Sequence, residues 1–475
     1  MPILVRRSIA LAAICAAFFS PQSHPDDAWP QFRGPNGSAV SLSGNFPIHF
    51  GPNSNVVWKT ALPSGHSSPC IWGNKIFLTG FAEGQLQTIC LDRVDGKISW
   101  RRSLTPGRIE RGASTGNPAA STPATDGQRV YVYFGAFGLA AYDFEGTEIW
   151  RKPLPVPVTQ HGAGTSPIVA DGRVVLSSDQ DVDSYLLAVD AQTGKTIWKT
   201  ARDEFRRGFS TPLFWPPDRP EVIVLPGTLR LVAYDFKTGA ARWHVNGLPN
   251  EMVASPAAGD GLIFVAGWTP GAGSRSLPTF EALLEQGDRD HDGRLTREEA
   301  PPGPARQHFL YIDANKDGFA TRDEWESIAR IFASSENVLI AVRPGGLGDV
   351  TATRVLWKQK RGLPYVPSPL FYDHRVFLIK NGGLVSSFDA KTGRACYQEE
   401  RIGVVGDYYS SPVAAAGKIC VASQSGAVTI LKSGETLEVL ARNNLGEPII
   451  ATPAIVGETL YVRTLNFLYA FSEQP

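Results

Sequence analysis

The sequence predicts an all-β fold, an eight-bladed β-propeller that carries a small α-helical insertion. A unit of about 44 residues recurs along the chain, and each copy opens on Ser/Thr-Pro followed by a short apolar strand. In the best-preserved copy, Ala188 to Trp198, one strand ends in Asp, a Thr-Gly turn follows, and the next strand ends in Trp. Short antiparallel strands repeated at this period are typical of propeller blades, whereas one long interval between openings carries a helical pattern instead.

Eight Ser/Thr-Pro openings predict eight blades. Each opening starts an inner strand, and three further strands complete a blade that buries one face against its neighbour. Aromatic residues end most of the outer strands, at Trp58, Trp100, Trp150, Trp198, Trp243, Trp357 and Tyr397. The openings are Ser68-Pro69, Thr122-Pro123, Ser166-Pro167, Thr211-Pro212, Ser255-Pro256, Ser368-Pro369, Ser411-Pro412 and Thr452-Pro453.

The two ends of the repeat array predict how the ring closes. The last unit ends at Phe471 without a fourth strand, whereas a strand ending in Trp58-Lys59 precedes the first opening. We expect this N-terminal strand to complete the eighth blade, because closure removes exposed edge strands. The predicted organisation is a signal peptide over 1–23, an N-terminal segment over 27–57, blades one to five over 58–274, the insertion over 275–337 and blades five to eight over 338–475.

The predicted insertion contains two tandem acidic loops, from Asp288 to Glu299 and from Asp313 to Glu324. Both follow the pattern Asp-x-(Asp/Asn)-x-(Asp/Asn)-Gly-x₅-Glu, in which oxygens at positions 1, 3 and 5 converge on one ion and Gly permits the turn. Apolar residues at helical spacing flank the loops. The segment from Pro278 to Phe332 therefore resembles the EF-hand family.

This pattern predicts two calcium sites. Because Asn315 replaces a carboxylate in the second loop, we expect the first loop to bind more tightly. The alternative, a pair of acidic surface turns, is disfavoured by two tandem matches. The expected ligands are Asp288, Asp290, Asp292, the carbonyl of Arg294, Thr296 and Glu299 in the first loop, and Asp313, Asn315, Asp317, the carbonyl of Phe319, Thr321 and Glu324 in the second.

Composition and the N-terminus restrict partners and location. Lys+Arg and Asp+Glu both number 46, and this balance argues against nucleic acid or an anionic membrane as the main partner. Arg6-Arg7 before an apolar run over 9–19 predicts a cleaved export signal, since the run is too short to span a bilayer. We expect a periplasmic or extracellular protein without a transmembrane segment. Lipidation of Cys15 is disfavoured because Ile14, which precedes it, is not small.

Four cysteines, Cys70, Cys90, Cys396 and Cys420, remain after signal cleavage. Cys70 and Cys90 fall on the first and third strands of one predicted sheet, which places them about 9–10 Å apart, too far for a disulfide. We therefore expect free, buried thiols.

The Asp-x-x-Thr-Gly-x-x-x-Trp units, such as Asp190 to Trp198, resemble pyrroloquinoline-quinone (PQQ) repeats. The segment from Trp29 to Gly37 resembles the opening of exported PQQ-like propellers. That family includes quinoprotein dehydrogenases and non-catalytic assembly proteins. The favoured interpretation is a non-catalytic binding or assembly scaffold with structural calcium. The alternative is a PQQ-dependent dehydrogenase with an atypical quinone site in the channel. The site would be atypical because the chain lacks the adjacent Cys-Cys pair that such enzymes typically carry.

One face of the predicted ring, here called the mouth, gathers the links between blades and the turns between second and third strands. We expect the insertion to stand beside the mouth, and a protein or small-molecule ligand to bind there. His66, His161, Glu251 and Asp407 lie on these segments without forming an acid–base constellation. Arg and Tyr, which are frequent at protein interfaces, also occur on this face, at Arg108, Arg111, Arg206, Arg207, Tyr365, Tyr408 and Tyr409. A separate acidic cluster, Asp179, Asp181 and Asp183, is interpreted as a solvated turn.

Overall fold

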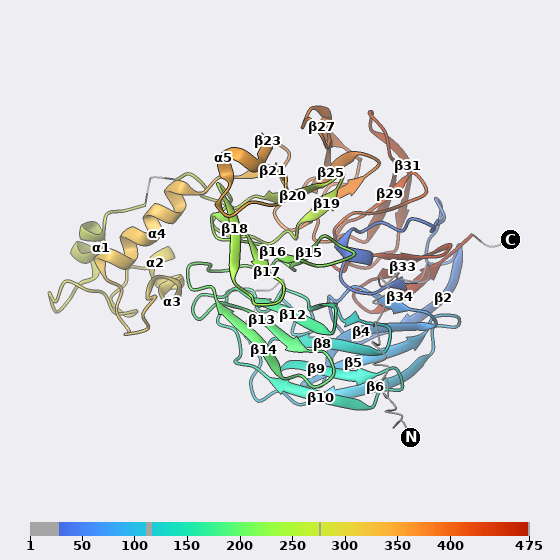
Figure 1. Ribbon diagram of the computed structural model, residues 1–475, viewed down its shortest axis with the longest axis horizontal. Coiled ribbons are helices and arrows are strands. Elements are labelled where there is room, and N and C mark those ends of the chain that lie inside the picture. The colour runs from blue at the N-terminus through green and yellow to red at the C-terminus, as the bar shows by residue number, and fades with distance from the viewer. Residues whose placement is uncertain (1–27, 111–115, 275–276, 474–475) are drawn as a thin grey trace, which may run out of the picture.

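Eight β-sheets surround one axis, so the predicted all-β, eight-bladed propeller is confirmed (Figure 1). The computed structural model describes residues 28–110, 116–274 and 277–473. The predicted signal peptide, Cys15 and Arg111 lie outside these residues.

Each blade is an antiparallel sheet of four strands, and two blades carry a fifth strand. The first blade contains β1 (Ala28–Trp29), β3 (Cys70–Trp72), β4 (Lys75–Ala82), β5 (Gln85–Asp92) and β6 (Ile98–Leu104), and the second contains β7 (Ala124–Thr125), β8 (Arg129–Phe134), β9 (Gly138–Asp143) and β10 (Glu148–Pro153). The third blade contains β11 (Ile168–Ala170), β12 (Arg173–Ser178), β13 (Tyr185–Asp190) and β14 (Thr196–Ala201). The fourth contains β15 (Leu213–Trp215), β16 (Val222–Gly227), β17 (Arg230–Asp235), β18 (Ala241–Asn246) and β22 (Gly348–Asp349). The fifth blade contains β19 (Ala257–Gly259), β20 (Leu262–Gly267), β21 (Val338–Val342) and β23 (Val355–Gln359), and the sixth contains β24 (Leu370–Tyr372), β25 (Arg375–Lys380), β26 (Leu384–Asp389) and β27 (Ala395–Arg401). The seventh blade contains β28 (Val413–Ala415), β29 (Lys418–Ala422), β30 (Ala427–Lys432) and β31 (Glu438–Asn444). The eighth contains β32 (Ala454–Val456), β33 (Thr459–Arg463), β34 (Phe467–Phe471) and β2 (Val56–Ala61).

The N-terminal strand closes the ring. Strand β2 pairs antiparallel with β34, so that Trp58 lies opposite Ala470 and Lys59 opposite Tyr469. The eighth blade therefore takes its outer strand from the start of the repeats and its other three from the end. This arrangement leaves no gap between first and last blades and explains why the last repeat is short.

Contacts between neighbouring blades explain why the repeat combines Thr-Gly with Trp. The indole nitrogen of Trp100 donates to the carbonyl of Phe144 in the turn of the next blade, at 2.8 Å. A Cβ atom on Gly146 would lie only 2.7 Å from the Trp100 ring, and this glycine has a φ of +85°. Glycine thus permits both the turn and the close approach. The same packing recurs for Trp58 on Gly96, Trp150 on Gly194, Trp198 on Gly239 and Trp357 on Gly393.

The segment that precedes β2 crosses one end of the central channel. Strand β1 pairs with β3 in the first blade, and Val40 bridges to Ala414 in the seventh. Between these points the buried Arg33 guanidinium donates to the carbonyls of Pro256 and Pro369, in the fifth and sixth blades. The segment thereby ties opposite sides of the ring together, an arrangement that the repeat pattern does not predict.

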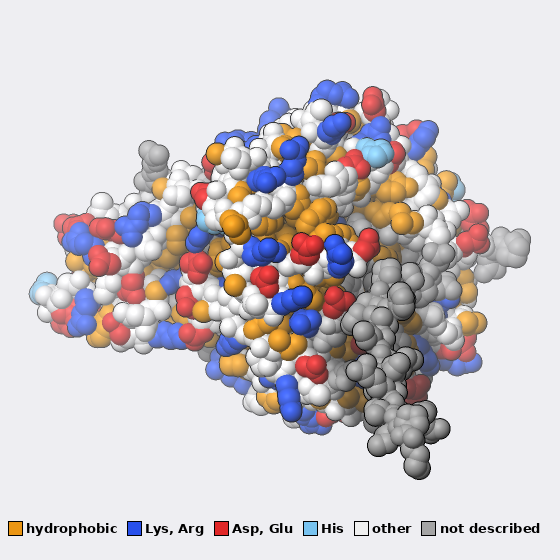
Figure 2. All heavy atoms as spheres, in the orientation of Figure 1, with side chains coloured by type: hydrophobic (Ala, Val, Ile, Leu, Met, Phe, Trp, Pro, Cys, Tyr) orange, Lys and Arg blue, Asp and Glu red, His pale blue; other side chains and the backbone are white. Residues whose placement is uncertain are grey.

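A helical unit, here residues 277–337, lies between β20 and β21 and projects from one side of the ring (Figure 1). It has its own small apolar core, which includes Phe280, Phe309 and Trp325. Figure 2 shows acidic and basic side chains interspersed over this projection. Its helices are α1 (Phe280–Gly287), α2 (Pro304–Gln307), α3 (Phe309–Ile312) and α4 (Arg322–Ser334); a 3₁₀ turn η1 (Pro35–Gly37) and α5 (Thr351–Arg354) belong to the ring.

The four cysteines within the described part of the chain are free, as predicted. Cys70 and Cys90 lie on β3 and β5, with β4 between them. Cys396 is only half-buried, which corrects the expectation of burial for all four. Its strand, β27, is the outer strand of its blade, where a side chain meets solvent more readily than on an inner strand.

Candidate functional site

The eight Ser/Thr residues of the repeat openings form a closed ring of hydrogen bonds around the channel. The backbone N–H of each donates to the hydroxyl oxygen of the next, from Ser68 to Thr122 onwards, at 2.9–3.1 Å. The last bond runs from Thr452 back to Ser68. The position of the Ser/Thr in the repeat thus explains its chemistry, because its short hydroxyl side chain accepts the N–H of the preceding blade.

A cavity of about 380 Å³ lies along the channel and includes all eight hydroxyl residues in its wall. Phe32, from the N-terminal segment, also lines it. The remaining polar and aromatic residues of the wall come mainly from the mouth links and comprise His66, Asn117, His161, Phe209, Glu251, Tyr365 and Tyr409. Three of the four mouth residues considered from sequence, His66, His161 and Glu251, therefore share one cavity, whereas Asp407 is not among its lining residues.

Glu251 is the acidic side chain of this cavity. The Tyr365 hydroxyl donates to its Oε1 at 2.9 Å. Burial raises the pKa of Glu251, although the Tyr365 hydrogen bond and the nearby His161 and Arg207 oppose the rise. Burial, with a smaller contribution from Arg463, lowers the pKa of His66 to about 4, so this imidazole is neutral at neutral pH.

The first acidic loop brings three predicted ligands together. Carboxylate oxygens of Asp288, Asp290 and Asp292 all lie within 4.8 Å of one another. Glu299 is anchored beside them by Thr296, whose backbone N–H and hydroxyl donate to Oε2 at 2.9 and 2.8 Å. The Thr296 hydroxyl therefore faces the Glu299 carboxylate and positions it.

The second loop repeats this geometry. The Gly318 N–H donates to Asp313 Oδ2 at 3.1 Å, as the Gly293 N–H does to Asp288 in the first loop. Asn315 Oδ1 accepts from the Asp317 N–H at 2.9 Å. Thr321 donates to Glu324 and also caps α4, with reciprocal bonds between the cap residue and Glu324.

The two loops are joined back to back. Leu295 and Ala320, at position 8 of each loop, exchange two backbone hydrogen bonds of 3.0 and 2.7 Å. The neighbouring position-7 side chains also meet, since the Arg294 guanidinium lies 3.8 Å from the centre of the Phe319 ring. Arg294 pairs in addition with Asp292 at 2.8 Å, so one predicted ligand is held by an ion pair in this structure.

One atom in each loop is suited to a cation. Asp288 Oδ1 and Asp313 Oδ1 are both buried without a hydrogen-bond partner in the described structure. A buried carboxylate oxygen without a partner carries an uncompensated desolvation cost, which a metal ion would offset. The oxygen-rich ligand sets, with four carboxylates in the first loop and three plus an amide in the second, fit calcium in type and number.

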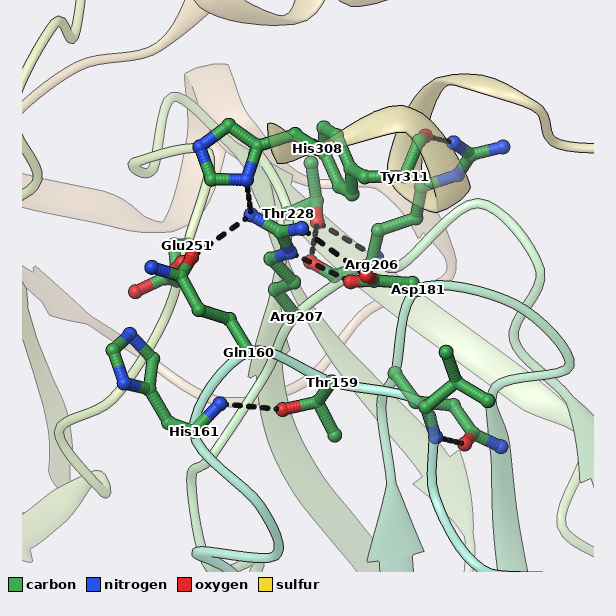
Figure 3. A network of polar contacts seen from close by, with 12 residues as sticks. Thr159, Gln160, His161, Asp181, Arg206, Arg207, Thr228, Glu251, His308 and Tyr311 are labelled. Atoms are coloured by element: carbon green, nitrogen blue, oxygen red, sulfur yellow. Dashed lines mark hydrogen bonds and ion pairs between the residues drawn. The ribbon is translucent and has the colours of Figure 1, made fainter. Parts of the chain in front are cut away.

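The helical unit contacts the mouth through α3 (Figure 3). Lys316 of the second loop adds an ion pair with Asp183. Arg207 reaches across, with its Nη1 3.2 Å from His308 Nδ1 and 3.3 Å from Gln160 Oε1. Arg206 donates to the carbonyl of Tyr311, two residues before the second loop. The exit from α4 is tied down as well, because the Asn250 N–H donates to Ser335 Oγ at 2.8 Å beside Glu251.

The expectation of a solvated acidic turn is wrong for two of its three members. Asp179 makes a bidentate ion pair with Arg202, with both N–O distances 2.7 Å and both side chains buried. Burial disfavours the charge of Arg202, but the Asp179 carboxylate raises the pKa of the guanidinium and keeps it charged. Asp181 pairs with Arg207 in the same way, and only Asp183 is exposed, in an ion pair with Lys316 of the second loop.

Six of the interface residues expected at the mouth lie in the described part of the chain. Arg206 bonds to the helical unit and Arg108 is exposed, and the other four divide into two groups. Tyr408 and Arg207 are buried, the latter by its contacts with Asp181 and Tyr311, so neither is free for an external partner. Tyr365 and Tyr409 face the cavity instead. Sequence reasoning missed Phe32 and the hydroxyl ring, although the invariable Ser/Thr before each Pro was the available signal.

The PQQ expectation finds little support in the chemistry of this cavity. The quinone carries three carboxylates, and a site for it would need cationic side chains or a bound cation to balance them. Among the described lining residues there is no Lys or Arg, and the one acidic side chain is that of Glu251. The residues present therefore do not fit this group.

The chain matches the family model described as outer membrane protein assembly factor BamB over residues 87–247, 182–300 and 311–474. No curated protein matches it by sequence. Similar solved structures include BamB from Moraxella catarrhalis, 14% identical with a TM-score of 0.54, covering 88% of this chain and 99% of that one. A quinohemoprotein alcohol dehydrogenase from Pseudomonas putida is 13% identical with a TM-score of 0.57, over 94% and 80%.

A europium-containing methanol dehydrogenase is also similar, 13% identical with a TM-score of 0.55, over 94% of this chain and 98% of the other. At such identities these likenesses establish the propeller fold and leave open whether the ring is a scaffold or an enzyme. Within the described residues, no helix has both the length and the apolar character needed to cross a membrane.

Proposed function

The chain belongs to the family described as outer membrane protein assembly factor BamB, and from this premise we propose that it is an exported, calcium-binding, non-catalytic scaffold. In this proposal the ring binds a ligand or protein partner at its mouth. The helical unit holds two calcium ions in paired EF-hand loops and stands beside that mouth. Extracellular modules of this kind bind calcium at roughly 10⁻⁴–10⁻³ M, so calcium outside the cell would keep the loops filled.

The observation that carries the proposal is the matched pair of partnerless oxygens, Asp288 Oδ1 and Asp313 Oδ1. Both loops leave the same atom of the same position without a hydrogen bond. Calcium would be held in the first loop by Asp288, Asp290, Asp292, the Arg294 carbonyl and Glu299. In the second loop, Asp313, Asn315, Asp317, the Phe319 carbonyl and Glu324 would take the same roles, while Thr296 and Thr321 position the glutamates. The ion would supply positive charge that ties each loop to its helices.

The mouth supports a binding role in preference to a catalytic one. No Ser or Thr hydroxyl of the described cavity wall donates to a carboxylate or an imidazole, and the one side-chain pair there is Tyr365 donating to Glu251. The alternative, a quinone-dependent oxidoreductase, draws on the dehydrogenases of similar fold, but the cavity does not fit a tricarboxylate quinone. A binding scaffold accounts for both the cavity and the fixed helical unit.

The calcium part is tested by calorimetry on four matched proteins. The wild-type chain is expected to take up two calcium ions, and Asp288→Ala with Asp313→Ala to take up none while the ring stays folded. Glu298→Gln with Asp323→Asn removes the charge of two exposed acids that occupy position 11 and are not expected ligands, and should keep both sites. Asp288→Ala alone should leave one site. Unchanged uptake in the double alanine variant would refute the assignment.

The scaffold part is tested by reconstitution with PQQ and calcium. We expect no bound quinone absorbance after gel filtration and no dye reduction with alcohols or sugars. Stoichiometric quinone that remains bound, together with turnover, would establish the oxidoreductase instead. The two tests are independent because calcium uptake is measured without quinone.

A further inference from the structure

The ionisable residues of the cavity wall decide which ligand charge the ring can accept. Glu251 is the one acidic residue of its described wall, and the wall contains no Lys or Arg. The buried Arg33 and Arg463 guanidiniums donate to Pro256 O and to Ser67 from behind the wall and do not line the cavity. His66, which does line it, is neutral above a pKa of about 4. A ligand that complements this wall is therefore cationic, because burying an anion beside Glu251 would add repulsion to the cost of desolvation.

The Arg207 guanidinium does not cancel this charge. It already makes two bonds to Asp181, of 2.6 and 3.1 Å, and lies 4.5 Å from the centre of the Tyr311 ring. Asp181 and Arg207 thus compensate each other at the rim. Glu251, by contrast, has Tyr365 as its one hydrogen-bond partner in the described structure, on Oε1, which leaves Oε2 for a ligand.

Aromatic residues line the same cavity as the Glu251 carboxylate. Tyr365 and Tyr409 line the cavity with Glu251, and Phe209 and Phe32 line it further along. His161 packs edge-on against Phe209, with ring centres 5.8 Å apart, which holds the phenyl ring in place. A cation against aromatic faces gains about 0.5–2 kcal/mol per contact when it is desolvated, and such boxes select ammonium groups that carry carbon substituents.

We infer that this cavity binds a small organic cation, whose ammonium group lies against Glu251 and the two tyrosines while an apolar body extends toward Phe209 and Phe32. The inference rests on the proposed function, since it names the chemical class of the ligand that the mouth of the ring takes. The cavity volume of about 380 Å³ suits a compact ligand rather than a macromolecule.

Metal ions and anions fit the wall less well. A divalent cation requires about six oxygen ligands, whereas this cavity offers one carboxylate that is already bonded to a phenol. The ring hydroxyls each accept a backbone N–H and are spread around the channel wall. An organic cation needs only one counter-charge and apolar surroundings, and the cavity supplies both.

Benzyltrimethylammonium, benzyl alcohol and benzoate provide a test, because they share one ring and differ in charge. Titration calorimetry of the calcium-loaded full chain should detect the ammonium compound, with the alcohol at least tenfold weaker and no detectable benzoate binding. Glu251→Gln should weaken the ammonium compound at least tenfold, and Tyr409→Leu several-fold. Asp407→Asn, at an exposed mouth acid outside the cavity, should leave its affinity unchanged.

Affinity for the alcohol equal to that for the cation, or benzoate binding of comparable strength, would overturn the inference. Should Glu251→Gln not fold, the charge series on the wild-type chain and Tyr409→Leu still decide it. Calcium uptake measured on the same preparation distinguishes failure of this inference from failure of the proposed function. Two calcium ions bound without any ammonium binding would sink this inference and leave the calcium scaffold standing, whereas ammonium binding without calcium uptake would remove the calcium part of the proposed function alone.

Discussion

The ring and the helical unit use the same interaction, an arginine paired with a carboxylate, in opposite surroundings. Arg202 and Asp179 lie inside the ring with side chains 0% and 3% exposed, and they join two segments of one blade. Arg322 and Glu281 lie on the helical unit, where the side chains are 51% and 50% exposed. The comparison shows that the ring depends on buried polar contacts, whereas the unit depends on its small apolar core and, we propose, on calcium.

The largest expected effect comes from breaking the buried pair. Arg202→Ala leaves Asp179 buried beside Gly208 without its partner, and an uncompensated buried charge typically costs about 3–5 kcal/mol of unfolding free energy. Arg322→Ala, the matched change on the unit, should cost about 1 kcal/mol or less, because an exposed pair is screened by solvent. Urea denaturation of both variants, monitored by tryptophan fluorescence, measures the difference. Equal losses would show that the unit is as integral to stability as the ring.

Acid sensitivity should also differ between the two regions. The pKa of His66 in the ring falls to about 4 through burial, whereas an unfolded histidine titrates near 6.5. Between these values the unfolded chain binds a proton that the folded chain does not, so stability falls as the pH falls through this window, by at most about 3 kcal/mol.

His66→Gln should therefore flatten the dependence of the unfolding free energy on pH between about 6.5 and 4. The helical unit provides the counterpart, His308, whose pKa is also lowered by burial and by Arg207 but which is less enclosed. His308→Gln should change the slope less than His66→Gln. A pH profile of His66→Gln that coincides with that of the wild type would show that this imidazole charges freely in the folded ring.

Removing the helical unit tests whether the ring is complete without it. Strands β20 and β21 pair directly, with Gly267 opposite Val338, so replacing residues 269–336 by Asn-Gly would join them through a hairpin turn. We expect a folded ring without calcium uptake. It should lose about 1–3 kcal/mol, because Asn250 gives up its hydrogen bonds to Ser335 and Thr269. Circular dichroism, thermal unfolding and calorimetry provide the measurements, and an insoluble chain would contradict an accessory role for the unit.

The two regions also differ in how far their sequences predict them. The blades were predictable because each repeat encodes local chemistry, such as Gly146 in a turn that packs on Trp100. The closing strand was predictable as well, since a missing fourth strand at one end matched a spare strand at the other. In the helical unit, the loop pattern prescribes which oxygens face inward, and Asp288, Asp290 and Asp292 do converge.

Contacts between segments far apart in sequence were not predictable. Phe32 and Arg33 belong to a short segment without periodicity, and only the folded ring reveals that they fill one end of the channel and join its sides. Asp179 and Asp181 resemble a solvated turn because their partners, Arg202 and Arg207, come more than 20 residues later. Spacing rules detect local geometry, whereas burial of a charge depends on which residue of opposite charge the fold brings near it.

The smallest expected effect concerns the exposed ion pair between the regions, Lys316 of the second loop and Asp183 of the ring. The side chains are 47% and 73% exposed, and such pairs contribute about 0–1 kcal/mol. In an Asp288→Ala background, which isolates the second loop, Lys316→Gln should raise calcium affinity a few-fold at low salt, because a cation beside the ion is removed. Asp183→Asn should lower it by a smaller factor, and the double variant shows whether the two changes are coupled.

The Lys316–Asp183 pair tests whether the ring and the helical unit are energetically independent or coupled. If Asp183→Asn changes calcium affinity, then calcium must change the stability effect of that substitution by the same free energy, because linkage is reciprocal. We expect calcium to stabilise the contacts of α3 with Arg206 and Arg207, and thereby the rim of the cavity that contains Glu251. Calcium affinity that is identical in Asp183→Asn and its parent, even at low ionic strength, would mean that this ion pair transmits nothing and that the two regions act independently through it.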